Sequence, residues 1–189
     1  MSKPRNQLRI IGGHWRGRKL PFPEVPGLRP TPDRVRETLF NWLMPVITGA
    51  RCLDLFAGSG ALGLEALSRG ASQVVFVDNH TAVIQQLHSN LALLQSTAAE
   101  AVKAEALHYL QGPASPFDIV FLDPPYQVDL LPECIERLEQ GGWLNSHAWI
   151  YLEASSKSGL PSLPPSWTLY RSKTAGEVGY HLVQRVASS

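Results

Sequence analysis

From residue 51 onward, short apolar runs alternate with segments of helical periodicity, and this alternation is what most limits the folds open to the chain. A short apolar run between such segments is typical of a strand that is buried on both faces. Strands joined by helices connect through right-handed crossovers, so we expect a doubly wound, mostly parallel sheet. The expected strands are 52–56, 74–77, 101–102, 119–122 and 149–152, and the expected helices are 62–69, 81–94, 105–111 and 129–139.

The end of the chain departs from this alternation. Two strand-like runs, 167–171 and 179–185, are separated by the short polar segment 173–177 with no helical segment between them. Two strands joined in this way form a hairpin. We therefore expect the last strands to add an antiparallel hairpin to the parallel sheet.

A strand, a glycine loop and a helix follow one another over residues 53–69. Gly58, Gly60 and Gly63 match the spacing of dinucleotide-binding loops, and Asp78 lies twenty residues beyond Gly58, close to where a ribose-binding acid is expected. Both a nicotinamide dinucleotide and S-adenosylmethionine need a tight turn without side chains and an acid for the ribose hydroxyls. The loop by itself does not separate the two cofactors.

Asp54 favours S-adenosylmethionine. It lies four residues before Gly58, where a carboxylate would repel a pyrophosphate. S-adenosylmethionine has no phosphate and carries an ammonium and a cationic sulfonium, so an acid beneath the loop attracts it. A buried structural role, with the carboxylate bonded to loop amides, is compatible with this interpretation.

Two further segments complete the predicted cofactor site. Asp78 closes the second expected strand, and Glu105 follows the third, where methyltransferases often place an acid or amide near the adenine. Glu105 serves equally well as a surface helix residue. The predicted cofactor-binding residues are Asp54, Phe56, Gly58, Ser59, Gly60, Asp78, Asn79, Glu105 and Ala106.

The segment Asp123-Pro124-Pro125-Tyr126 comes directly after the buried run 117–122. Its two prolines forbid a helix and stiffen the turn, so a backbone carbonyl can lie beside the Asp123 carboxylate. Two fixed acceptors bind the two hydrogens of an aromatic amine and direct its lone pair toward a methyl donor, while Tyr126 offers a flat face for stacking. These four residues are predicted to be catalytic, by direct in-line methyl transfer to an exocyclic amine.

Charge is unevenly distributed along the chain. Residues 1–36 hold nine Lys or Arg and two acidic residues, whereas the net charge of the whole chain is only +1. Glycine, tryptophan and apolar residues interleave these charges over residues 8–20, which indicates a small hairpin rather than a disordered tail. A helix is expected to start at Thr31 as its cap, with Pro32 at the first helical position, and to be closed by Pro45 and Gly49. The basic segment is thus predicted to meet phosphate.

Taken together, these motifs resemble the bacterial 16S ribosomal RNA guanine-N(2)-methyltransferase family of RsmD type. The likeness covers essentially the whole chain and rests on residues 8–13, 15–20, 27–31, 33–41 and 123–126. The glycine loop and the Asp-Pro-Pro-Tyr motif occur in many methyltransferases, whereas the basic N-terminal block is specific to this family. One departure is Glu105, where relatives commonly have Asp or Asn.

The resemblance implies a fold, a substrate and a partner. The fold is α/β, a single-domain class I, Rossmann-like S-adenosylmethionine-dependent methyltransferase (residues 31–189) with a seven-stranded, mostly parallel sheet and a basic extension (1–30). The substrate is the 2-amino group of a guanine in 16S ribosomal RNA, within the 30S subunit or an assembly intermediate. The residues implied in RNA binding are Arg9, Trp15, Arg16, Arg18, Lys19, Arg29, Arg34 and Arg36.

Three other functions stay open at this point. The first is an adenine 6-amino methyltransferase acting on DNA or RNA, which the same amine-binding motif would serve. The second is a nicotinamide-dependent oxidoreductase, and the third is a non-catalytic RNA-binding or assembly factor. No metal site is predicted, Cys52 and Cys134 are expected to be reduced core residues, and a cytoplasmic monomer without a membrane segment is expected.

Overall fold

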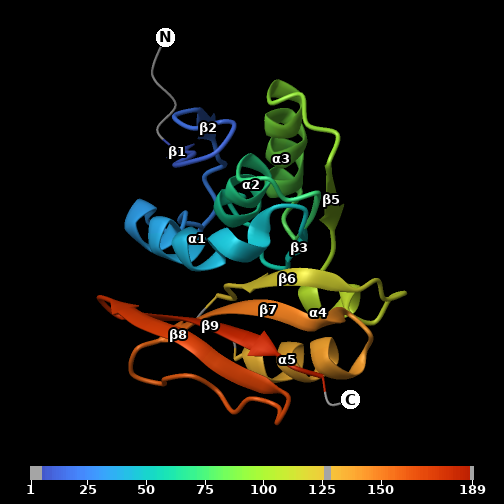
Figure 1. Cartoon of the computed structure of the whole chain (residues 1–189). Helices are drawn as coiled ribbons and strands as arrows, with labels where there is room; N and C mark the ends of the chain where they lie inside the picture. The colour runs from blue at the N-terminus through green and yellow to red at the C-terminus, as the bar shows by residue number, and fades with distance from the viewer. Residues whose placement is uncertain (1–5, 126–128, 188–189) are drawn as a thin grey trace.

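The computed structural model describes residues 6–125 and 129–187 and contains the expected sheet (Figure 1). Seven strands are ordered β5-β4-β3-β6-β7-β9-β8, with β5, β4, β3, β6 and β7 parallel and the hairpin β8–β9 antiparallel. This confirms the predicted fold class. The strands are β3 Arg51–Asp54, β4 Gln73–Asp78, β5 Ala99–Lys103, β6 Phe117–Leu122, β7 Leu144–Ser155, β8 Trp167–Ala175 and β9 Val178–Arg185.

Helices cover both faces of the sheet, because alternate residues of each strand point to opposite sides. Cys52 and Phe121 belong to the core beneath α1 (Asp33–Ile47), α2 (Ala61–Ser68) and α3 (Thr81–Leu93). Leu53 and Leu122 belong to the core beneath α4 (Ala106–Tyr109) and α5 (Leu131–Gln140). The result is a three-layer α/β architecture.

The basic segment forms a small antiparallel hairpin of β1 (Gln7–Arg9) and β2 (Lys19–Pro21), as predicted. Residues 10–18 form a turn-rich loop between them. Leu8, Ile10 and Leu20 are buried and join the core beneath α1, α2 and α3. The extension is therefore packed onto the main body of the protein.

The predicted start of α1 and the predicted role of Pro45 were wrong, whereas Gly49 follows the end of the helix as predicted. The helix begins at Asp33 after Pro32, and no side chain caps it. The carbonyl of the buried Thr31 accepts a hydrogen bond from Arg36. Pro45 lies inside the helix rather than ending it. Pro45 removes one amide hydrogen bond near the end of the helix, but the helix continues to Ile47, and the chain turns away at Gly49, whose φ is 79°.

The two cysteines are free and buried, as expected. No helix in the described part of the chain is long and apolar enough to cross a membrane.

Candidate active site

Three acids stand at the carboxyl ends of neighbouring strands. Asp54 ends β3, Asp78 ends β4, and Asp123 directly follows β6. The chain runs outward from β3 through β4 to β5 and then returns to β6 on the other side of β3, so the strand order reverses between β3 and β6. Ligands bind open α/β sheets outside the strand ends at such a reversal. The predicted cofactor loop and amine-binding motif flank it.

The glycine loop after β3 has the geometry that its glycines permit. Gly58 and Gly60 have φ values of 54° and 82°, in the left-handed region. A β-carbon on Gly60 would stand 2.6 Å from the Leu87 side chain, and one on Gly63 would stand 2.2 Å from the ring of Phe76. Gly60 is therefore required by packing and by backbone conformation, and Gly63, already in α2, is required by packing alone.

Asp54 is buried beneath this loop. One carboxylate oxygen accepts a hydrogen bond of 3.0 Å from the amide of Gly63, in the first turn of α2. Burial raises the pKa of Asp54 to about 8, with the Gly63 bond opposing the rise and the charge of Asp78 adding to it. A buried acid with a raised pKa gains free energy from a cation placed beside it, because the cation favours the ionised form.

The predicted adenosine-binding residues lie together. Asp78 accepts hydrogen bonds of 3.0 Å from the amides of Gly58 and His80, which orient its carboxylate at the end of β4. The side-chain amide of Asn79 donates to Glu105 across 3.2 Å, so the exposed segments after β4 and β5 are joined. Of the other predicted cofactor residues, Ser59 and Ala106 are buried and Phe56 is half-buried.

These residues fit S-adenosylmethionine better than a dinucleotide. The loop from Leu55 to Ala61 has no basic side chain, and two acids, Asp54 and Asp78, approach it from below. An ammonium or sulfonium beside Asp54 favours its ionised form, whereas a pyrophosphate would oppose that ionisation and would meet no basic partner in the loop. In this arrangement Asp54 would face the methionine part of the cofactor, and Asp78, Asn79 and Glu105 would face the adenosine.

The predicted amine-binding motif begins at the end of β6, next to the predicted cofactor loop. Asp123 is partly buried, Pro124 is buried and Pro125 is exposed. The pKa of Asp123 is raised by burial, by the charge of Glu153 and a side-chain hydrogen bond to it, and by the charge of Asp54. Tyr126 lies outside the described residues. Asp123 thus stands between the cofactor acid and a second acid that the sequence analysis did not identify.

That second acid is Glu153 on β7. It is 6 % exposed, and it accepts a hydrogen bond of 2.5 Å from the hydroxyl of Tyr151, two residues earlier on the same face of the strand. The sequence signal was weak, since Glu153 is simply one acid at the end of an apolar run. Its position beside Asp123 depends on the pairing of Leu122 with Leu152, which links segments thirty residues apart.

The loop of the basic hairpin is docked on α2. The buried Glu65 accepts hydrogen bonds from the amides of Ile11 and Gly12 at 3.0 Å, and Ser68 bonds Trp15 and Gly12. The same helix begins directly after the glycine loop. The position of the basic loop is therefore fixed relative to the cofactor-binding edge.

Most of the predicted RNA-binding side chains are accessible. The half-buried one is Trp15, and the exposed ones are Arg9, Arg16, Arg18, Lys19, Arg29 and Arg34. Leu28, next to Arg29, would lie 3.9 Å from a β-carbon on Gly58. The proline-rich segment between β2 and α1 therefore runs beside the glycine loop at Leu28, the neighbour of the exposed Arg29.

Arg36 is a correction to the predicted RNA-binding set. Its side chain is 1 % exposed. The guanidinium donates to the carbonyls of Thr31 and Arg9 at 3.0 and 2.9 Å and to Asp33 at 2.5 Å, and it lies 3.8 Å from Glu65. With these partners Arg36 holds the hairpin against α1 and does not face solvent.

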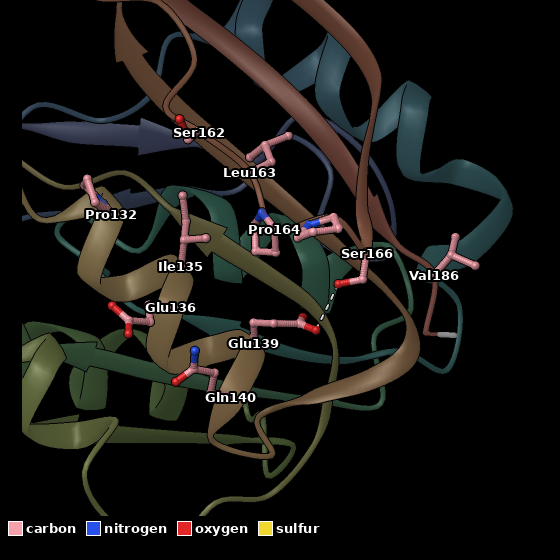
Figure 2. Close-up of a pocket in the computed structure, with 11 residues that line it drawn as sticks. Pro132, Ile135, Glu136, Glu139, Gln140, Ser162, Leu163, Pro164, Ser166 and Val186 are labelled. Atoms are coloured by element: carbon pink, nitrogen blue, oxygen red, sulfur yellow. Dashed lines mark hydrogen bonds between the residues drawn. The ribbon is translucent and has the colours of Figure 1, made fainter. Parts of the chain in front are cut away.

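A surface pocket of about 730 Å³ lies elsewhere, between α5 and the loop before β8 (Figure 2). Glu139 extends along it and bonds Ser166, Trp167 and Arg185. Its described lining includes none of the predicted cofactor or amine-binding residues. This pocket is therefore separate from the predicted reaction site at the sheet edge.

Known proteins similar to this chain are methyltransferases. The family model described as Conserved hypothetical protein 95 matches residues 8–184. A protein of Escherichia coli K12 named ribosomal RNA small subunit methyltransferase D is 55% identical over 99% of this chain and 96% of its own length, and its namesake in Haemophilus influenzae is 48% identical over 95% of both. The solved structure of a putative methyltransferase from E. coli superposes with a TM-score of 0.91 at 55% identity, covering 97% of this chain and all of that one.

Proposed function

Because this chain belongs to the family described as Conserved hypothetical protein 95 and is an S-adenosylmethionine-dependent methyltransferase, we propose that it methylates the 2-amino group of a guanine in small-subunit ribosomal RNA. The observation that carries the proposal is the position of Asp123. It follows β6 beside the cofactor loop and opens the Asp-Pro-Pro motif that suits an aromatic amine.

Each acid of the site has a different role in the proposed reaction. S-adenosylmethionine supplies a methyl group that is activated by a cationic sulfur. Asp54 stabilises the positive charge of the bound methionine part, and Asp78 orients the ribose. Asp123 accepts hydrogen bonds from the amine, and these bonds turn the lone pair of the amine nitrogen toward the methyl group. Positioning of this kind supplies much of the rate, because the reacting atoms meet already aligned.

The choice of RNA rests on the exposed basic side chains and on the relatives. The two relatives described above are named for small-subunit ribosomal RNA, and the chain matches both over nearly all of its length. Arg16, Arg18, Lys19, Arg29 and Arg34 are exposed on the N-terminal side of the protein and would contact phosphates. We propose a cytoplasmic monomer that acts on 16S ribosomal RNA in the 30S subunit or an assembly intermediate.

The choice of guanine over adenine rests on the family resemblance rather than on the site. Either base presents an exocyclic amine of the same shape to Asp123. A base that is paired or stacked must leave that state to reach the site, at a cost of a few kcal/mol.

A transfer assay with the purified protein tests the polymer substrate. S-adenosylmethionine with a labelled methyl group is incubated with 30S subunits from a strain that lacks the corresponding activity, and with 50S subunits as control. We expect label in 16S ribosomal RNA and none in 23S ribosomal RNA or in ribosomal proteins. Label confined to protein or to the 50S subunit would refute the proposal.

A further inference from the structure

Asp123 and Glu153 directly follow Leu122 and Leu152, which are paired across the neighbouring parallel strands β6 and β7, so their side chains lie on the same face of the sheet. Glu153 is buried there, and its charge and a side-chain hydrogen bond to it raise the pKa of Asp123. Two carboxylates in contact do not both ionise near neutral pH without a large electrostatic cost. A hydrogen bond between them requires a proton on one of the two.

The ionisable groups around the pair come from three strands. Asp54 approaches from β3 and Tyr151 from β7, and Tyr180 of β9 is the cross-strand partner of Glu153. Helix α1 covers this face with Phe40 and Trp42, which contact Phe121 and Tyr180 and do not titrate. These described groups are carboxyls and phenols, so none of them supplies a positive charge that would offset the repulsion.

We propose that Glu153 is a positioning residue for methyl transfer: anchored by Tyr151, it shares one proton with Asp123 and so holds the Asp123 carboxylate toward the amine. This inference rests on the proposed function, because it assigns a role at the same site. The shared proton holds one carboxyl oxygen of Asp123 in a hydrogen bond with Glu153. The other oxygen of Asp123 is then free to accept a hydrogen bond from the substrate amine. When the proton is lost, the two carboxylates repel each other and Asp123 loses its position.

A titration without substrate tests the shared proton. In protein labelled with ¹³C at the aspartate carboxyl carbons, the resonance of Asp123 is assigned with Asp123→Asn and followed as a function of pH. We expect Asp123 to titrate well above the usual range of an aspartate, and Glu153→Gln to lower its pKa by about one unit or more, because the neighbouring charge is gone. An unchanged Asp123 pKa in Glu153→Gln would overturn the proposal, whatever the substrate proves to be.

Kinetics separate positioning from a structural role. Glu153→Gln still offers a hydrogen-bond donor to Asp123, so we expect kcat within a few-fold of the wild type and no loss of rate at alkaline pH. Glu153→Ala offers no donor, and kcat should fall about tenfold or more with little change in KM for S-adenosylmethionine. Tyr151→Phe should lower kcat less than Glu153→Ala does. It should also keep the fall in kcat at alkaline pH that we expect for the wild type.

The matched control is Glu139→Gln. Glu139 is a carboxylate on α5, away from the predicted site, and it also has several hydrogen-bond partners. This variant should leave the pH profile of kcat unchanged. Equal kcat in Glu153→Ala and the wild type, or a Glu153→Gln protein as slow as Glu153→Ala with its fold intact, would contradict a positioning role. A wild type that transfers no methyl group to RNA refutes the proposed function instead, and the titration of Asp123 then decides on the shared proton.

Discussion

The buried carboxylate of Glu65 accepts a hydrogen bond of 3.0 Å from the backbone amide of Gly12, and this contact joins the basic hairpin to the helix that follows the cofactor loop. Glu65 also bonds Arg69 and the amide of Ile11. A single acid therefore organises the loop that presents Arg16 and Arg18.

Replacement of Glu65 by alanine should release that loop. The amides of Ile11 and Gly12 would lose their acceptor, so we expect their hydrogen exchange to accelerate and RNA binding to weaken. Exchange measured by NMR checks this, with the exposed Glu133→Ala of α5 as control. Unchanged protection of both amides in Glu65→Ala would show that Glu65 does not hold the loop.

Arg34 and Arg36 form a matched pair on α1, since one is exposed and the other buried. Arg36→Ala removes the partner of Glu65 and of two backbone carbonyls, and breaking a buried ion pair costs about 3–5 kcal/mol. We expect a Tm lower by about 6–20 °C. Arg34→Ala should leave the Tm unchanged and weaken RNA binding. Thermal denaturation and filter binding distinguish the two, and the reverse pattern would restore Arg36 to the RNA-binding set.

Arg16→Ala and Arg18→Ala should each weaken binding to 30S subunits while leaving the affinity for S-adenosylmethionine unchanged. Each side chain is exposed on the docked loop. Loss of one phosphate contact should make the negative slope of log K against log salt concentration shallower by about one. Binding curves at several salt concentrations measure that slope. Arg171→Ala, an exposed residue of β8, serves as control. Identical slopes in all four proteins would remove the loop from the RNA interface.

The raised pKa of Asp54, about 8, predicts proton release when the cofactor binds. In the ligand-free protein at pH 7 the carboxyl is mostly protonated, and a bound cation favours the ionised form, so binding lowers its pKa and expels a proton. Affinity should therefore rise as the pH approaches 8.

Calorimetry in two buffers of different ionisation enthalpy counts the released protons. Asp54→Asn still offers an acceptor to the amide of Gly63, and it should release fewer protons than the wild type at pH 7. The same count in both proteins would mean that Asp54 does not face the cation.

The positions of Asp54, Asp78 and Asp123 were predictable because each follows an apolar run, and the carboxyl ends of parallel strands share one edge of a sheet. The position of Glu153 beside Asp123 was not predictable, since it depends on the register between β6 and β7. Arg36 was misassigned for a related reason. A charge pattern counts arginines but does not reveal a buried partner such as Glu65, which lies in a later helix.

The nucleoside that carries the new methyl group tests the central claim most directly. After reaction of the purified protein with labelled S-adenosylmethionine and unmodified 30S subunits, the 16S ribosomal RNA is digested to nucleosides and analysed by mass spectrometry. We predict label in 2-methylguanosine at one site, abolished by Asp123→Ala. Label in 6-methyladenosine, or full transfer by Asp123→Ala, would contradict the account.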